Sequence, residues 1–88
     1  METIFLKLKV RSYKMIHGFD SDNREIEEIV TEEKWIDKLV MISRIQSISE
    51  KYVRMVYSHE RIIYWEYEGG LEMLQKRLQS ANLVINPD

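Results

Sequence analysis

Residues 4–11 read IFLKLKVR, in which aliphatic residues at the even positions alternate with Phe5, Lys7, Lys9 and Arg11 at the odd positions. Side chains of a β-strand point alternately to opposite faces, so this pattern gives one aliphatic face and one basic face. It predicts a strand over residues 3–12. Working outward, residues 17–23 read HGFDSDN, a cluster of turn formers that predicts a loop after the strand.

The segment that follows is acidic, and its secondary structure has two interpretations. Asp22 with Glu25 three residues later makes a capping box, and Ile26, Ile29 and Val30 recur at helical spacing. These features predict a short helix over residues 23–33. A β-hairpin arm over the same residues is the alternative.

The rest of the chain reads as a series of strands and one helix. Strands are expected at residues 35–42, 45–50, 52–58 and 61–67, with a single helical turn between the first two, because β-branched and aromatic residues alternate there. Gly69 and Gly70 precede a helix over residues 70–81, and a short edge strand is expected at residues 83–85.

The expected fold is α+β. It has an antiparallel sheet of four or five strands, with the C-terminal helix packed on one face. A ferredoxin-like βαββαβ arrangement is the alternative, and it would follow if residues 23–37 formed one long helix.

Composition indicates one small globular domain over residues 1–88, with 13 basic and 15 acidic residues and a formal net charge of −2. The chain has no cysteine, which excludes disulfides, thiolate metal sites and a cysteine nucleophile. No secretory signal or membrane-spanning run is recognised, so a cytoplasmic protein is expected.

Motifs for catalysis and for cofactors are missing from the sequence. His59-Glu60 begins like the zinc-protease motif, but Ile63 stands where the second histidine is required. His17 is the only other histidine, and no glycine-rich phosphate loop or nucleophile elbow is found. We therefore expect no enzyme activity, no metal and no cofactor.

The preferred functional hypothesis rests on residues 20–33, which hold seven carboxylates and one arginine. Such a segment can steer association with a basic partner. The sequence thus predicts a small non-catalytic protein-binding module, either an inhibitor or a regulatory protein. Its candidate binding residues are Asp20, Asp22, Glu25, Glu28 and Glu32.

Two alternatives concern other surfaces of the expected sheet. Lys7, Lys9 and Arg11, extended by Arg54 and Tyr52 if their strands are neighbours, form a basic and aromatic surface of the kind that binds nucleic acid. Exposed strand edges also permit a structural or self-associating role, as in a homodimer formed by edge pairing.

A resemblance to known proteins covers about half of the chain. Residues 45–55 read IQSISEKYVRM, residues 63–64 read IY, and residues 70–74 read GLEML with Leu78 after them. Together they resemble LytTR-type DNA-binding domains, and the strand–hairpin–helix order is similar to that of FlbD-like small bacterial β-sheet proteins. The LytTR resemblance implies a DNA-binding transcriptional regulator of bacterial or phage-like type. In that family basic and hydroxyl residues after the helix read DNA, whereas residues 78–86 here, LQSANLVIN, contain no basic residue.

Overall fold

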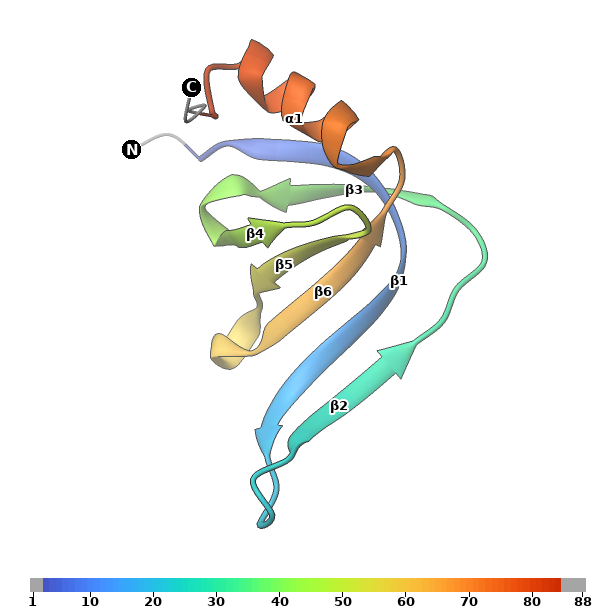
Figure 1. Ribbon diagram of the computed structural model, residues 1–88, viewed down its shortest axis with the longest axis vertical. Coiled ribbons are helices and arrows are strands. Elements are labelled where there is room, and N and C mark those ends of the chain that lie inside the picture. The colour runs from blue at the N-terminus through green and yellow to red at the C-terminus, as the bar shows by residue number, and fades with distance from the viewer. Residues whose placement is uncertain (1–2, 85–88) are drawn as a thin grey trace.

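The chain forms an antiparallel β-sheet with one C-terminal helix, as described for residues 3–84 by a computed structural model (Figure 1). Within these residues the sheet has six strands. Five of them follow the order β2-β1-β6-β5-β4, and the sixth, β3, pairs with β1 outside this order. The elements are β1 Phe5–Phe19, β2 Glu25–Val30, β3 Ile36–Met41, the 3-10 turn η1 Ile42–Arg44, β4 Ile45–Ile48, β5 Tyr52–Val56, the 3-10 turn η2 Ser58–Glu60, β6 Ile62–Tyr67 and α1 Gly70–Ser80. The α+β class is confirmed, and the sheet has more strands than the four or five expected.

β1 is one bent strand that is hydrogen-bonded to three others. Its first half, from Phe5 to Val10, pairs with β3, and its second half pairs with β2. β6 pairs with the middle of β1, and the register of this pairing shifts between Val10 and Tyr13. A bulge of this kind bends a strand and increases its twist. The curvature of β1 in Figure 1 carries its first half, together with β3, over the β4-β5-β6 hairpins.

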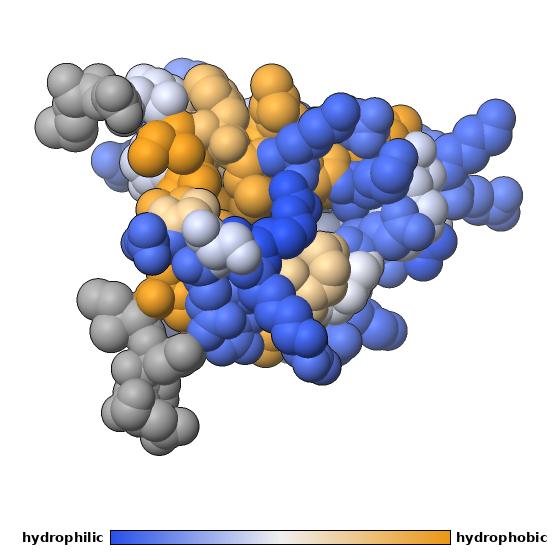
Figure 2. Space-filling model, turned by 90° about the horizontal axis from the view of Figure 1, so that it is seen from above, coloured by the Kyte–Doolittle hydropathy of each residue, from blue (hydrophilic) through white to orange (hydrophobic). Residues whose placement is uncertain are grey.

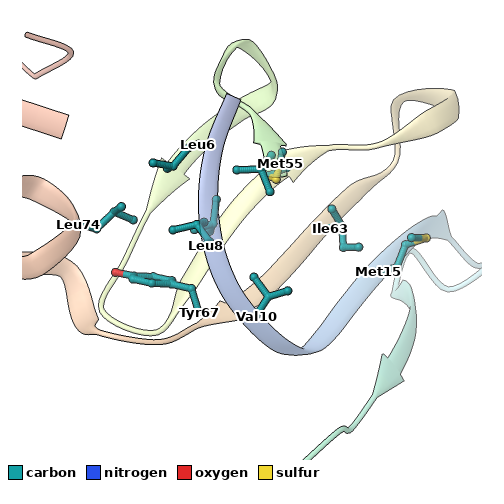
Figure 3. Close-up of a cluster of buried hydrophobic side chains, with 10 residues drawn as sticks. Leu6, Leu8, Val10, Met15, Met55, Ile63, Tyr67 and Leu74 are labelled. Carbon is teal, nitrogen blue, oxygen red and sulfur yellow. The ribbon is translucent and has the colours of Figure 1, made fainter. Parts of the chain in front are cut away.

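The hydrophobic core lies inside this bend. Leu6, Leu8 and Val10 of β1 alternate with exposed residues, so the aliphatic face of the opening pattern is the buried face. Figure 3 shows these side chains together with those of the β5 and β6 strands. The buried residues are Leu6, Leu8, Val10, Met15, Val40, Val53, Met55, Ile63, Tyr67 and Leu74.

α1 contributes to this core through Leu74, whose side chain points from the helix toward β1 in Figure 3. The chain reverses from β6 into α1 at Gly69 and Gly70, which have φ angles of 111° and 80°. This left-handed region favours glycine, and a Cβ at Gly69 would overlap the Met73 side chain. The two glycines therefore place the helix over the first half of β1.

The helix expected over residues 23–33 is wrong, and the hairpin alternative is right. Residues 25–30 form β2, paired antiparallel with β1 from Tyr13↔Val30 to Phe19↔Glu25. An isolated helix this short is marginal in water. In the structure Ile26 and Ile29 are 45% and 67% exposed, so this segment is not held in place by burial of its apolar side chains. Pairing with β1 provides hydrogen-bond partners for the backbone N–H and C=O groups of this segment instead. β1 itself continues to Phe19, into the segment predicted as a loop.

The remaining elements follow the predictions closely. The strands expected at residues 35–42, 45–50, 52–58 and 61–67 correspond to β3, β4, β5 and β6, with η1 as the expected helical turn. The ferredoxin-like alternative is wrong because its first helix is a strand. Leu83 and Val84 are not in a strand, and Ile85 lies outside the described residues.

Polar and apolar side chains are unevenly distributed over the surface. Seen from the α1 end in Figure 2, hydrophilic residues cover most of the near face, and hydrophobic ones gather on one side. The exposed large hydrophobic residues of β1, β2 and β3 are Phe5, Phe19, Ile26, Ile29, Ile36 and Leu39. These three strands therefore form the least covered part of the sheet.

Leu74 provides a test of how α1 holds the core closed. Its side chain is 0% exposed, so we expect Leu74→Ala to lower the free energy of unfolding by about 2–5 kcal/mol. Leu71→Ala on the same helix is the matched control. Because Leu71 is 38% exposed, this variant should lower the free energy of unfolding by a clearly smaller amount. Urea unfolding followed by circular dichroism measures both. Equal losses for the two variants would contradict this packing of the helix.

Candidate functional site

The acidic segment forms a hairpin arm made of the second half of β1, the turn after it, and β2. We call residues 13–32 the acidic arm. At its tip the Asp20 side chain accepts hydrogen bonds from the backbone N–H groups of Asp22 and Arg24, both at 2.9 Å, and Asn23 takes a left-handed φ of 61°. Asp20 therefore fixes the turn, while Asp22 is exposed.

The strand register distributes the carboxylates of the arm over both of its faces. Glu27 is paired with Ile16 and Glu28 with Met15, and adjacent residues of a strand face opposite ways. Glu32 follows the strand, where its backbone N–H and C=O both hydrogen-bond the Ser12 hydroxyl, at 3.1 and 3.2 Å. The five candidate residues thus lie along one arm, but their side chains are not all on the same face of it.

Two carboxylates of the arm lie close to nitrogen-bearing side chains of β1. The carboxylate of Glu28 lies 2.9 Å from the imidazole of His17, and that of Glu27 lies 3.5 Å from the ammonium of Lys14. Within the described residues, Glu25 and Glu32 have no ion-pair partner. Negative charge therefore remains available for an external partner.

Exposed apolar residues accompany these charges. Phe19 is 63% exposed, Ile29 67% and Ile26 45%. Large apolar side chains with polar neighbours are typical of contact surfaces between proteins. The arm thus combines charge with apolar area, a feature that charge counting alone did not detect.

The basic row on β1 is largely occupied by contacts within the protein. Lys9 lies 3.3 Å from Asp37 of β3, and Arg11 makes two hydrogen bonds to Glu66, at 2.7 and 3.2 Å. The guanidinium of Arg11 also lies 4.3 Å from the ring centre of Trp35. Lys7 is exposed and has no ion pair within the described residues, so it is the least engaged member of the row.

The structure does not bring Arg54 to this row. Arg54 is paired with Tyr64, and Tyr64 is paired with Lys14 on the other side. The two cations lie 5.7 and 5.0 Å from the centre of the tyrosine ring. Sequence reasoning missed Lys14 and Tyr64 because the register of β1, β5 and β6 is needed to align them.

A groove of about 490 Å³ lies beside this cluster on the outer face of the sheet. The residues that line it are Ser12, Tyr13, Lys14, Ile29, Thr31, Tyr52, Tyr64 and Glu66. Three of these eight residues are tyrosines, and Ile29 of the acidic arm also forms part of the lining. The groove and the arm are therefore neighbouring surfaces.

Three groups close to the bend of β1 have shifted pKa values, and the first is Arg11, whose pKa is raised by its hydrogen bond to Glu66. The hydrogen bond from Arg11 lowers the pKa of Glu66 below its ordinary value of 4.5. Burial raises the pKa of Tyr67, whose hydroxyl donates to the Ser49 carbonyl at 2.6 Å. These groups join separate segments of the fold through their hydrogen bonds.

Among residues 3–84, no three His, Cys, Asp or Glu side chains are grouped so that they could hold a metal ion. No helix in this part of the chain has the length and apolarity needed to cross a membrane.

Comparison with protein-family models, with curated proteins and with solved structures finds no match for this chain. Functional inference therefore depends on the geometry of the acidic arm and of the groove beside it.

The ion pair of Arg11 with Glu66 predicts a pH dependence of stability. A carboxyl group with a lowered pKa stabilises the fold fully above its unfolded value near 4.5, and this contribution is lost as the pH falls through the folded value. Glu66→Gln should therefore lower the free energy of unfolding at pH 7, by an amount that shrinks as the pH falls below about 4.5.

Urea midpoints at a series of pH values measure this dependence. Glu72→Gln is the matched control, because the Glu72 side chain is 85% exposed on α1 and should leave stability nearly unchanged. A loss for Glu66→Gln that stays constant from neutral to acidic pH would contradict the account.

Proposed function

We propose that this protein is a small non-catalytic protein-binding module whose acidic arm engages a basic partner. The observation that carries the proposal is that carboxylates and exposed apolar side chains lie together on one protruding hairpin. Figure 1 shows that β2 extends away from the β4-β5-β6 part of the sheet and from α1. An inhibitor or a regulatory protein that binds its target by this arm is the form that fits best.

Electrostatic attraction supplies the first part of the binding argument. The arm carries six carboxylates against the two cations Lys14 and Arg24, so its formal net charge is −4 with histidine taken as neutral. The six are Asp20, Asp22, Glu25, Glu27, Glu28 and Glu32. Charges of one sign on an exposed surface raise the association rate with a partner of opposite sign. Because these side chains are exposed, the attraction is expected to weaken as salt shortens the Debye length, from about 30 Å at 0.01 M to about 8 Å at 0.15 M.

Apolar contact supplies the second part. Ile26 and Ile29 are exposed on opposite faces of β2, as the register places them. Binding energy in protein interfaces is concentrated in a few buried side chains surrounded by polar ones. The two isoleucines can serve as such anchors, with the carboxylates around them selecting a basic partner.

Nucleic-acid binding is the second candidate, and the Lys14–Tyr64–Arg54 cluster favours it. Cations beside aromatic rings are typical of surfaces that bind single strands. The LytTR resemblance of residues 45–74 agrees with it. Against it, Glu27 lies 3.5 Å from Lys14, so phosphates at the groove would face carboxylates of the arm.

Reversing charge on the arm tests the proposal. The variant Glu25→Lys, Glu28→Lys, Glu32→Lys should lose binding to a lysine-rich peptide, measured by fluorescence anisotropy at low and at physiological salt. The matched control is Asp37→Lys, Glu68→Lys, Glu72→Lys, which changes the net charge equally on exposed residues outside the arm.

The control variant should bind several-fold more tightly than the arm variant. Equal loss in both variants would mean that only net charge matters, and the proposal would be wrong. Binding to a labelled single-stranded oligonucleotide that disappears in Lys14→Glu, Arg54→Glu would favour the second candidate instead.

A further inference from the structure

We infer that the basic partner binds as an extended strand added to the free edge of β2, with a sequence pattern that complements this strand. The inference rests on the proposed function and goes further, because it specifies the backbone conformation of the partner segment and the order of its residues. It is drawn from the strand pairing, the exposure and the charge order of β2.

The edge of β2 is open to another strand. Within residues 3–84, β2 pairs with β1 alone. Every second residue of an antiparallel edge strand directs its N–H and C=O away from its neighbour, and such groups are a template for strand addition. All residues of β2 except Val30 are exposed, so nothing in the described chain covers this edge.

The charge order of β2 indicates which strand fits. Residues 25–29 read EIEEI, with Glu27 and Ile29 on the outer face and Glu28 on the opposite face. Residues directly across a strand pair contact each other, and opposite charges or two apolar side chains are favourable there. An antiparallel partner strand therefore needs the order apolar-basic-basic-apolar-basic, such as Val-Lys-Lys-Val-Lys.

A second copy of this chain does not meet this requirement. If two β2 strands pair antiparallel so that Ile26 faces Ile29, Glu27 faces Glu28 of the other copy. Like charges directly opposite each other destabilise a strand pair. Negative charge on this edge thus disfavours self-pairing in this register, and the edge is available to a basic strand.

Other open edges of the sheet lack such a pattern. β4 pairs only with β5 among the described strands, and its sequence, IQSI, has no charged residue. β3 carries Asp37 and Lys38 side by side, and Asp37 is paired with Lys9. Residues 5–9 of β1 are strand-paired with β3 on one side only, and their exposed cations are Lys7 and Lys9. Among these open edges, β2 is therefore the one whose charge is negative and selects a basic partner.

The inference is tested with synthetic peptides and isothermal titration calorimetry. The first peptide contains Val-Lys-Lys-Val-Lys, and the second contains the same residues in the order Lys-Lys-Lys-Val-Val. Two further versions of the first peptide are N-methylated on alternate residues, one version for each alternate set. N-methylation removes the backbone donor and keeps the charge.

Strand addition predicts that the first peptide binds roughly five- to tenfold more tightly than the reordered one. One of the two N-methylated peptides should lose binding, because its blocked residues face β2, and the other should keep it. The double variant Glu27→Lys, Glu28→Lys should no longer bind the first peptide, and it should bind a peptide that contains Val-Glu-Glu-Val-Lys. Because the variant is expected to gain binding to the second sequence, a loss of stability in the variant cannot by itself explain the result.

Each other outcome overturns a defined part of the account. Equal, salt-sensitive binding of all four peptides would overturn strand addition and leave the proposed function intact. No binding of any basic peptide at low salt would overturn both. A dimer of the free protein in sedimentation velocity, lost in Ile26→Glu, Ile29→Glu, would show that a second copy occupies the edge.

Discussion

The bend in β1 between Val10 and Tyr13 is the constraint on which the rest of the structure depends. Val10 is fully buried and is paired with Ile36 of β3 on one side and Tyr67 of β6 on the other. Beyond the bend the same strand pairs with β2. One continuous strand therefore serves both the core, through its first half, and the protruding arm, through its second half.

Side chains at the bend hold these two halves in a fixed relation. The guanidinium of Arg11 lies between the Glu66 carboxylate and the Trp35 ring, so it links β1, β6 and the segment before β3. Tyr13 packs on Trp65 with ring centres 4.7 Å apart. The arm thus begins at a point where three segments of the chain are joined, which supports it as a rigid contact element.

The sequence allowed most of the fold to be predicted, because alternation and helical spacing are local properties. The alternation in residues 4–11 locates the buried face, and the spacing of Leu71, Leu74 and Leu78 locates α1. The acidic segment was different, because Ile26, Ile29 and Val30 fit a helix as well as a strand. Only the length of β1, which provides a pairing partner, decides between them.

The candidate site shows the same division between local and non-local information. The acidic residues were recognisable as a charged segment, but their placement on both faces of a hairpin depends on β1 pairing. Likewise, Arg54 meets Lys14 across Tyr64 and does not meet Lys7, because strand order places β6 between β5 and β1. Strand order and register are set by contacts between residues distant in sequence, which composition does not encode.

In the proposed complex the acidic arm is already folded before its partner arrives, and β2 is the edge to which the partner strand is added. Hydrogen exchange of the backbone amides at Ile26–Val30, followed by NMR with and without a saturating basic peptide, tests this most directly. The account predicts slower exchange at those amides of β2 that point away from β1, with little change in β5 and β6. Unchanged exchange in β2 with the peptide bound, or protection confined to residues 52–66, would contradict it.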